Sequence, residues 1–317
     1  MKNRRVIVIA GPTASGKTDL GIAVALAIGG EIVSADSMQI YRGMNIGTAK
    51  ASADEQKQVK HHMIDVADPW ENYSVARYVE EAAVCCDMLL MEGRVPVIVG
   101  GTGLYIDSLL AGRSFGKQAE DETLRKKLNE EYETEGGEKL LEKLSTFDPE
   151  RAAILHPADK KRIVRAMEVY YLSGETITEH DRKTREIPPR YEATVLIPGF
   201  HNRALLYERI DRRVGEMIRQ GLFEEVRTLL DSGIPAGATA MQAIGYKEAV
   251  DVVCGRISEE DAADHIRQAS RRYAKRQITW FARRQDAIRL FHDDPGGTEK
   301  MTAEAVYRAK ESIHDNS

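Results

Sequence analysis

Residues 11–18 read GPTASGKT, a complete G-x-x-x-x-G-K-[ST] phosphate-binding loop. The loop follows an apolar run at residues 6–10 and precedes a helical pattern, which is the context in which such loops bind phosphate groups. Backbone N–H groups of the loop cradle a diphosphate or triphosphate, Lys17 neutralises it, and Thr18 can coordinate Mg²⁺. The residues expected at the phosphates are Gly11, Pro12, Thr13, Ala14, Ser15, Gly16, Lys17 and Thr18. The loop predicts polyphosphate binding but leaves the transferred group open.

Apolar runs of strand length alternate with helical patterns along most of the chain. A helix from about residue 18 should end at Gly29 and Gly30, because glycine favours a helix C-terminus. Strands that alternate with helices predict an α/β fold: a P-loop NTPase-like parallel sheet covered on both faces. The expected strands lie at residues 6–10, 31–34, 95–99, 193–198 and 288–291, with 63–66 as the weakest candidate.

The strand pattern disappears between residues 113 and 190, where charged helical segments replace it. These segments lie at about 120–133, 138–145 and 160–172. Because a strand pattern returns at residue 193, the sequence predicts an all-helical subdomain inserted into a core made of residues 1–112 and 191–317.

Asp36 follows the second expected strand, and in open α/β sheets ligands bind outside the carboxyl ends of the strands. An aspartate in a turn or at a helix N-cap is the simpler interpretation, but the phosphate loop at the same sheet edge favours chemistry on a bound group.

The strand at 95–99 has no acidic residue at its end, where a P-loop NTPase usually keeps a magnesium-binding aspartate. It leads instead into Gly100, Gly101 and Thr102. Glycine lets the backbone approach a ligand closely and Thr102 offers a hydroxyl, but a plain glycine turn is an equally good interpretation. The missing aspartate argues against ATPase chemistry.

Basic charge is concentrated in particular helices although the formal net charge of the chain is −5. Residues 265–284 contain no acidic residue, and aromatic residues are interleaved with the basic ones. This combination is typical of a surface that binds a phosphate backbone, although a solvated helix face has the same composition. The candidates on this helix are Arg271, Arg272, Lys275 and Arg276, and the insertion adds Lys161, Arg162 and Arg165. Arg209 and Arg213 share one helix face and either clamp a leaving phosphate or pair with nearby acids.

The three cysteines are too few for a disulfide framework and lack zinc-site spacing, which favours a reducing cytoplasm. No apolar segment approaches the length that spans a membrane, so we expect no membrane association. We also expect a monomer.

Eight segments extend the sequence signal beyond the phosphate loop. They are GPTASGKT from residue 11, DSMQIYRGMNIGTAK from 36, HHMID from 61, GGTGLY from 100, DKKRIVRAMEV from 159, RIDRRV from 209, AIGYKE from 243 and KRQITWF from 275. In this order, over residues 6–281, the chain resembles the bacterial tRNA dimethylallyltransferases, the isopentenyltransferases of the IPP transferase family. Several of the segments are specific to that family, which the phosphate loop is not.

The resemblance implies transfer of a dimethylallyl group from dimethylallyl diphosphate to N6 of the adenosine 3′ of the anticodon, with release of pyrophosphate. It implies that the phosphate loop holds the diphosphate with Mg²⁺ at Thr18, that Asp36 accepts the N6 proton, and that the insertion contacts the tRNA anticodon stem-loop. The implied catalytic residues are Lys17, Asp36, Thr102 and Arg209 or Arg213, the choice between the two arginines staying open. The residues expected at the tRNA are Asp36, Ser37, Met38, Gln39, Thr102, Arg125, Lys161, Arg162, Arg165, Arg271, Arg272, Lys275 and Arg276.

Two other enzyme classes share part of this pattern. A P-loop small-molecule kinase would explain the loop and the sheet, but neither the basic helix nor the missing aspartate. An adenylate isopentenyltransferase would use the same donor with a free nucleotide acceptor, which leaves the helical insertion without a task. A non-catalytic RNA-binding protein would have no use for Lys17 together with Asp36.

Overall fold

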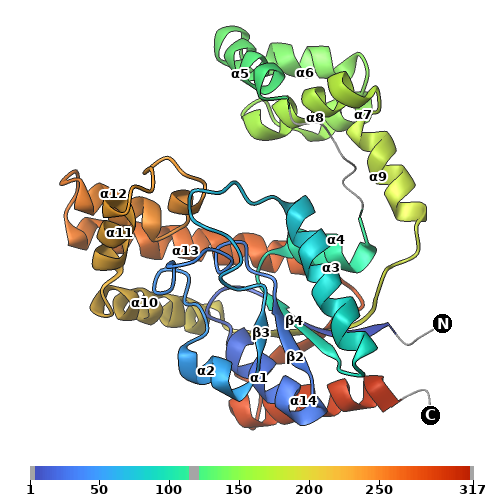
Figure 1. Ribbon diagram of the computed structural model, residues 1–317, viewed down its shortest axis with the longest axis vertical. Helices are drawn as coiled ribbons and strands as arrows, with labels where there is room; N and C mark the ends of the chain where they lie inside the picture. Colours follow the sequence, from blue (N-terminus) through green and yellow to red (C-terminus); the bar gives the residue numbers. More distant parts are fainter. Residues whose placement is uncertain (1–3, 114–120, 315–317) are drawn as a thin grey trace. The chain divides into compact units, whose positions relative to one another are not determined.

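The computed structural model describes residues 4–113 and 121–314, which fold as two compact units. The larger unit, the core unit, comprises Met1–Gly112 and Arg190–Ser317, and the smaller unit, the insertion, comprises Arg113–Pro189. Figure 1 shows the helices and strands of both units.

Within the described residues, a parallel sheet of six strands in the order β3-β2-β4-β1-β5-β6 forms the centre of the core unit. The strands are β1 (Arg5–Ala10), β2 (Glu31–Ser34), β3 (His61–His62), β4 (Pro96–Gly100), β5 (Glu192–Gly199) and β6 (Ile288–Phe291). Strand β1 lies between β4 and β5, so the loop that follows it emerges from the middle of the sheet. The predicted α/β class is confirmed.

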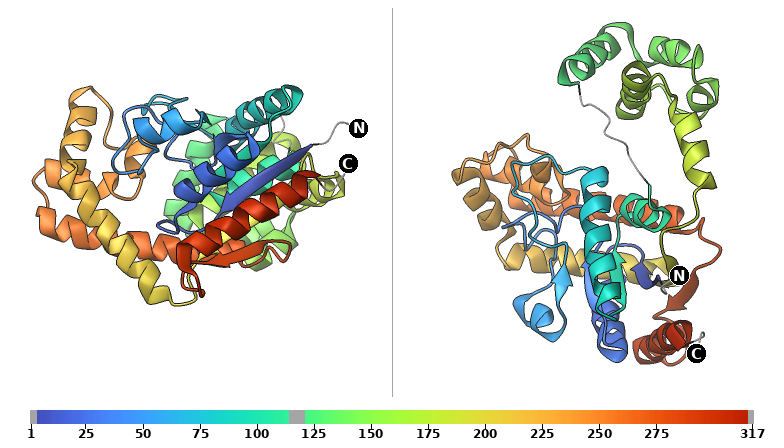
Figure 2. Two further views of the ribbon diagram at one scale, coloured as in Figure 1. Left: turned by 90° about the horizontal axis from the view of Figure 1, so that it is seen from below. Right: turned by 45° about the vertical axis from the view of Figure 1, so that its right-hand side comes forward.

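Helices cover the sheet and extend beyond its carboxyl edge. They are α1 (Lys17–Ile28), α2 (Ala53–Gln58), α3 (Val75–Met91), α4 (Gly103–Ala111), α10 (Arg203–Arg219), α11 (Leu222–Asp231), η1 (Ala240–Gln242), α12 (Tyr246–Val253), α13 (Glu259–Phe281) and α14 (Gly297–His314). Helix α1 ends at Gly29 in the left-handed conformation, as expected of a glycine C-cap. Helices α1 and α14 pack against each other, and α3 contacts α4 (Figure 2).

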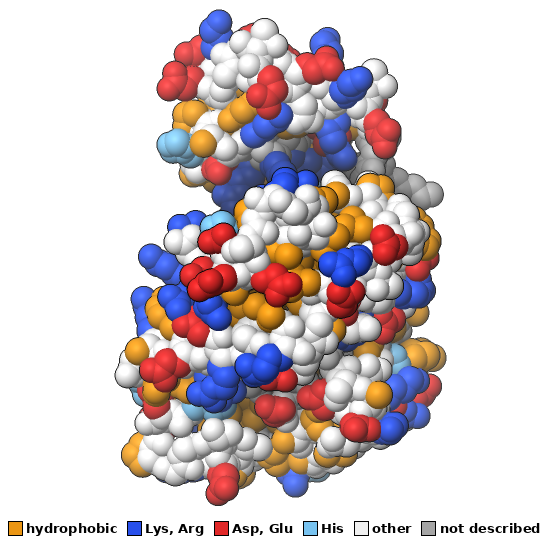
Figure 3. Space-filling view, turned by 90° about the vertical axis from the view of Figure 1, so that its left-hand side faces the viewer, with side chains coloured by type: hydrophobic (Ala, Val, Ile, Leu, Met, Phe, Trp, Pro, Cys, Tyr) orange, Lys and Arg blue, Asp and Glu red, His pale blue; other side chains and the backbone are white. Residues whose placement is uncertain are grey.

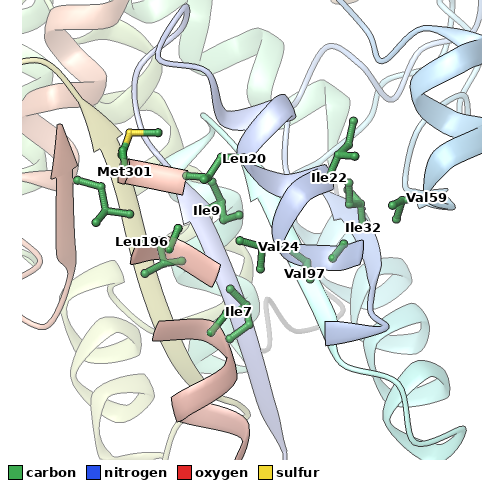
Figure 4. Close-up of a cluster of buried hydrophobic side chains, with 14 residues drawn as sticks. Ile7, Ile9, Leu20, Ile22, Val24, Ile32, Val59, Val97, Leu196 and Met301 are labelled. Atoms are coloured by element: carbon green, nitrogen blue, oxygen red, sulfur yellow. The ribbon is translucent and has the colours of Figure 1, made fainter. Parts of the chain in front are cut away.

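The main hydrophobic cluster lies between the sheet and helices α1 and α14. Ile7, Ile9 and Val97 project from β1 and β4 toward Leu20 of α1 and Met301 of α14 (Figure 4). Because side chains alternate across a strand, the buried neighbours of these strand residues pack on the opposite face. Burial on both faces holds β1 rigidly, and with it the start of the phosphate loop.

The described residues of the insertion form a bundle of five helices with its own core. They are α5 (Glu122–Glu135), α6 (Gly137–Ser145), α7 (Pro149–Ile154), α8 (Lys160–Ser173) and α9 (Ile177–Glu186). Leu128, Leu140, Leu144, Ile163 and Met167 are among its buried residues. These side chains recur at helical spacing within charged segments, which is why the sequence indicates helices there.

The weakest expected strand is absent. The third strand consists of His61–His62, whereas residues 63–66 form a bend in which Met63 and Asp65 have φ angles of 61° and 54°. A positive φ is incompatible with a strand, so the apolar run was misleading here. Of this run, Met63 is buried in the core and only 3% exposed, whereas Asp65 is exposed.

Candidate active site

The phosphate loop connects β1 to α1 at the carboxyl edge of the sheet. Gly16 is the N-cap of α1 with φ 79°, a left-handed conformation that favours glycine. The Lys17 Nζ donates to the Pro12 carbonyl oxygen at 2.6 Å, and the Ser15 hydroxyl donates to the same oxygen at 2.8 Å. The lysine side chain therefore folds back over the loop that a phosphate would occupy.

A cavity of about 330 Å³ opens beside this loop and brings together many of the residues that the sequence predicts. The predicted residues that line it are Thr13, Lys17, Thr18, Asp36, Ser37, Met38, Gln39, Arg213 and Arg276. The wall is completed by the loop at Gly47, Thr48 and Ala49, and by apolar side chains of α10 and α13. One cavity thus contains the loop lysine, the strand-end carboxylate and an arginine.

Asp36 stands in a tight turn directly after β2. Its Oδ1 accepts hydrogen bonds from the backbone N–H groups of Met38 at 2.9 Å and Gln39 at 3.4 Å. The turn interpretation and the cavity interpretation therefore both hold, because Oδ1 shapes the turn while the residue lines the cavity.

Thr102 supports this turn. It is not among the described residues that line the cavity. Its Oγ1 accepts a hydrogen bond from the Ser37 N–H at 3.0 Å. The preceding Gly100 is needed for close packing, since a Cβ there would lie 2.1 Å from the Ala35 carbonyl oxygen. The Gly100–Gly103 segment is therefore more than a plain turn: it fixes the backbone that presents Asp36.

Lys17, Arg213 and Asp36 interact electrostatically in the cavity. The pKa of Lys17 falls to about 7, mainly because desolvation disfavours the charged amine and also because Arg213 is near, while Asp36 acts in the opposite direction. Desolvation also lowers the pKa of Arg213, which Asp36 partly offsets. An anion that binds here is attracted strongly, because the two desolvated cations interact with it more strongly than they would in water.

The two arginines that the sequence left open have different positions. Arg213 lines the cavity, and its Nε is buried with no hydrogen-bond partner among the described residues. The Arg209 Nε donates to the Ala14 carbonyl oxygen at 2.9 Å, and its guanidinium lies 5.6 Å from the centre of the Phe200 ring. Arg213 therefore faces the cavity, where its guanidinium also donates to the Thr48 carbonyl oxygen at 3.4 Å, whereas Arg209 braces the phosphate loop.

Sequence reasoning missed two polar residues that hold the cavity walls. The Glu225 carboxylate accepts hydrogen bonds from the backbone N–H groups of Asn45, Ile46 and Gly47, and from the Tyr246 hydroxyl. Gln277 forms hydrogen bonds with two loops, at Thr13 and at Gly101. Glu225 and Gln277 are distant in sequence from the loops they hold, and no local pattern reveals such contacts.

The basic residues of α13 fall into two groups. Arg271 forms an ion pair with Asp211 of α10, so it fastens one helix to another. Arg272 and Lys275 are exposed, and the exposed Arg276 lies 5.5 Å from the centre of the Tyr273 ring. Basic and acidic side chains are mixed on the face drawn in Figure 3. Among the described residues of α13, exposed basic charge is thus confined to part of the helix, as the negative net charge of the chain predicts.

The basic residues of the insertion divide in the same way. Arg125 and Arg165 both pair with Glu168, whose side chain is 1% exposed. A buried carboxylate needs such partners, so these two arginines also have a structural task. Lys161 and Arg162 are exposed on α8.

Within the described residues no cluster of three or more His, Cys, Asp or Glu side chains could hold a metal ion. The oxygen donors that line the cavity beside the loop include the Thr18 hydroxyl and the Asp36 carboxylate. None of the helices in the described ranges is long and apolar enough to cross a bilayer.

Comparisons with known proteins identify relatives over nearly the whole chain. Residues 39–285 match a family model described as IPP transferase, and residues 4–68 match one described as isopentenyl transferase. A tRNA dimethylallyltransferase of Pelotomaculum thermopropionicum is 42% identical over 98% of each chain. One of Geobacillus thermodenitrificans is 46% identical over 96% of this chain and 95% of its own.

Solved structures agree with these relatives. The tRNA isopentenylpyrophosphate transferase of Bacillus halodurans has a TM-score of 0.70 at 36% identity, covering 98% of this chain and 100% of that one. A eukaryotic dimethylallyltransferase acting on tRNA has a TM-score of 0.85 at 26% identity, covering 99% and 81%. The resemblance drawn from the eight segments is thereby confirmed, and the chain belongs to the IPP transferase family.

Proposed function

We propose that this protein transfers a dimethylallyl group from dimethylallyl diphosphate to N6 of the adenosine 3′ of the anticodon in tRNA, releasing pyrophosphate. The observation that carries the proposal is the single cavity lined by Lys17 and Thr18 of the phosphate loop and by the carboxylate residue Asp36. Membership of the IPP transferase family supports it. A cytoplasmic location fits a tRNA acceptor, and the expected monomeric state stays a prediction.

The reaction breaks the bond between C1 of the donor and its diphosphate oxygen and forms a bond between C1 and N6. Adenine N6 is a weak nucleophile, because its lone pair is delocalised into the ring. We assign Asp36 as the general base that accepts the N6 proton as the new bond forms. The adenosine has to leave the loop stack to enter the cavity, as in other base-modifying enzymes.

Negative charge develops on the leaving diphosphate as the allylic carbon departs. Lys17 and Arg213 line the cavity and are desolvated, so their charges stabilise this oxyanion more than they would in water. Arg209 contributes indirectly by holding the Ala14 carbonyl of the loop. We therefore propose Arg213 as the arginine that contacts the diphosphate.

The donor set near Thr18 fits Mg²⁺, because this ion keeps several waters and uses substrate phosphate oxygens rather than an all-protein cage. One protein hydroxyl, that of Thr18, is then enough. A bound Mg²⁺ would neutralise charge on the diphosphate and orient it.

We propose that the insertion and the exposed part of α13 bind the anticodon stem-loop. Lys161 and Arg162 of the insertion are the stronger candidates because both are exposed. Arg162 forms a long ion pair of 3.9 Å with Asp159, whereas Arg125 and Arg165 pair closely with the buried Glu168. On α13 the corresponding residues are Arg272, Lys275 and Arg276.

Replacing both Arg272 and Lys275 with glutamate is expected to weaken tRNA binding in a salt-dependent way. If each cation neutralises one phosphate, the slope of log K against log[salt] falls by about 2 in magnitude. Filter binding of an unmodified tRNA at several salt concentrations measures the slope. The matched control is Lys300→Glu with Lys310→Glu, which changes the net charge equally on α14. An unchanged slope in the α13 variant would remove this helix from the tRNA interface.

The proposed function is tested by incubating the purified protein with unmodified tRNA, radiolabelled dimethylallyl diphosphate and Mg²⁺, with no nucleotide added. Label is expected in the tRNA, at the adenosine 3′ of the anticodon after nuclease digestion. In a parallel incubation that also contains AMP, label in AMP but not in tRNA would identify an adenylate isopentenyltransferase. In another that contains ATP, consumption of ATP without use of the prenyl donor would identify a kinase.

A further inference from the structure

Gln277 is a buried polar side chain of α13, only 5% exposed, that links two loops of the active site. Its Oε1 accepts a hydrogen bond from the backbone N–H of Thr13 in the phosphate loop at 2.8 Å. Its Nε2 donates to the carbonyl oxygen of Gly101 at 2.9 Å. Both functional groups of the amide are thus used, one on each loop.

The surroundings leave little freedom for this bridge. A Cβ at position 101 would lie 2.3 Å from the Gln277 Nε2, so the glycine there makes room for the amide. Gln277 and Thr13 line the large cavity, whereas their chain neighbours Ile278 and Pro12 line a second cavity of about 290 Å³. The contact between Gln277 and Thr13 therefore belongs to the partition between the two cavities.

The two bridged loops have different tasks in the proposed reaction. Thr13 belongs to the loop that would hold the diphosphate, and Gly101 precedes Thr102, whose hydroxyl fixes the turn of Asp36. The helix that carries Gln277 also contributes Tyr273 and Arg276 to the cavity.

We propose that Gln277 is a positioning residue that sets the phosphate loop at the correct distance from the carboxylate of Asp36. This inference rests on the proposed function. The bridge contacts neither substrate in our assignment, and it acts by keeping the donor carbon aligned with the acceptor nitrogen. Small misalignments of reacting atoms are costly, so the bridge matters for the rate more than for ground-state binding, which depends mainly on charge.

Gln277→Met keeps the shape of the side chain but removes both hydrogen bonds. We expect kcat to fall by about 10- to 100-fold, while the KM for the prenyl donor and the Kd for tRNA change much less. The matched control is Gln268→Met, the same change at an exposed position of the same helix, which should behave like the wild type. A kcat within twofold of the wild type, or a loss confined to KM, would overturn the inference.

Gln277→Glu adds a pH test of the bridge. If Gln277 only stabilised the fold, the kcat of this variant would not recover at low pH. A protonated glutamic acid accepts from Thr13 and donates its O–H to Gly101, as glutamine does, whereas an ionised carboxylate points an oxygen at the Gly101 carbonyl. Burial raises the pKa of such a carboxyl group, so the protonated form gains as the pH falls. The ratio of its kcat to that of the wild type is therefore expected to rise from pH 8 to pH 6. A flat ratio would contradict the bridge, and this variant also covers the case in which Gln277→Met fails to fold.

Amide hydrogen exchange separates this inference from the proposed function. Faster exchange of the peptide containing Thr13 in Gln277→Met, but not in Gln268→Met, supports the bridge even if the wild type transfers no prenyl group to tRNA. Equal exchange in both variants would show that Gln277 does not hold the loop.

Discussion

Replacing Asp36 with asparagine is expected to reduce the rate of prenyl transfer by about 10²- to 10⁴-fold, because the reaction loses its general base. Asparagine is a better test than alanine. Its side-chain oxygen can still accept the hydrogen bonds from the N–H groups of Met38 and Gln39, so the turn after β2 keeps its shape. Single-turnover assays at saturating tRNA and donor measure the chemical step directly.

Binding measurements decide whether this loss is chemical. The variant should bind tRNA as the wild type does and should bind pyrophosphate equally well or more tightly, since a negative charge near Lys17 and Arg213 has been removed. Asp19→Asn is the matched control: it removes one negative charge from the exposed first turn of α1 and should leave the rate unchanged. Near-normal turnover by the Asp36 variant would exclude this carboxylate as the base.

Most strands of the core unit could be predicted from the sequence, because each is marked by a short run of apolar residues. The five strands expected at residues 6–10, 31–34, 95–99, 193–198 and 288–291 are apolar runs, and each appears within one residue of its expected bounds. The short strand His61–His62 was missed because it pairs over only two residues with β2. The adjacent apolar run was mistaken for it, since burial alone does not distinguish a strand from a buried bend.

The candidate site could be predicted from the sequence where its residues follow a strand. The phosphate loop and Asp36 each stand at the end of a strand, and parallel strands bring these ends to one edge. The choice between Arg209 and Arg213 could not be made from spacing, because both lie on one face of α10 and only tertiary contacts separate them. Glu225 and Gln277 were missed for the same reason, since each acts on a loop far away in sequence.

The pattern of basic residues does not show which cations form ion pairs within the protein. The sequence does not distinguish the exposed Arg272 from three arginines that form ion pairs. Arg271 pairs with Asp211 on another helix, and Arg125 and Arg165 pair with the buried Glu168. Such pairs join residues on different helices or one turn apart. The number of basic residues in a segment therefore does not show which of them have an acidic partner.

Replacing Lys17 with methionine is expected to lower kcat/KM for the prenyl donor by about 10³-fold, because a desolvated cation that meets the leaving diphosphate is lost. Methionine keeps most of the length of the side chain, so packing against the loop changes little. Initial rates over a range of donor concentrations, at saturating tRNA and Mg²⁺, measure the ratio. A loss smaller than about tenfold would mean that Arg213 and the metal ion carry the charge without Lys17.

The lowered pKa of Lys17 gives the same residue a second, independent signature. With a pKa of about 7 the free enzyme holds Lys17 partly neutral at neutral pH, and a bound diphosphate favours the charged form and raises that pKa. Binding therefore takes up a fraction of a proton per site near pH 7, more at higher pH, and little well below pH 7, where Lys17 is already charged. Calorimetry in buffers of different ionisation enthalpy measures this uptake, and the difference between wild type and Lys17→Met isolates the lysine from the titration of the diphosphate itself. Equal uptake by the two proteins at pH 7 and pH 8 would show that Lys17 is fully charged before the donor arrives, and the desolvation of this site would then contribute nothing to the selection of an anionic ligand.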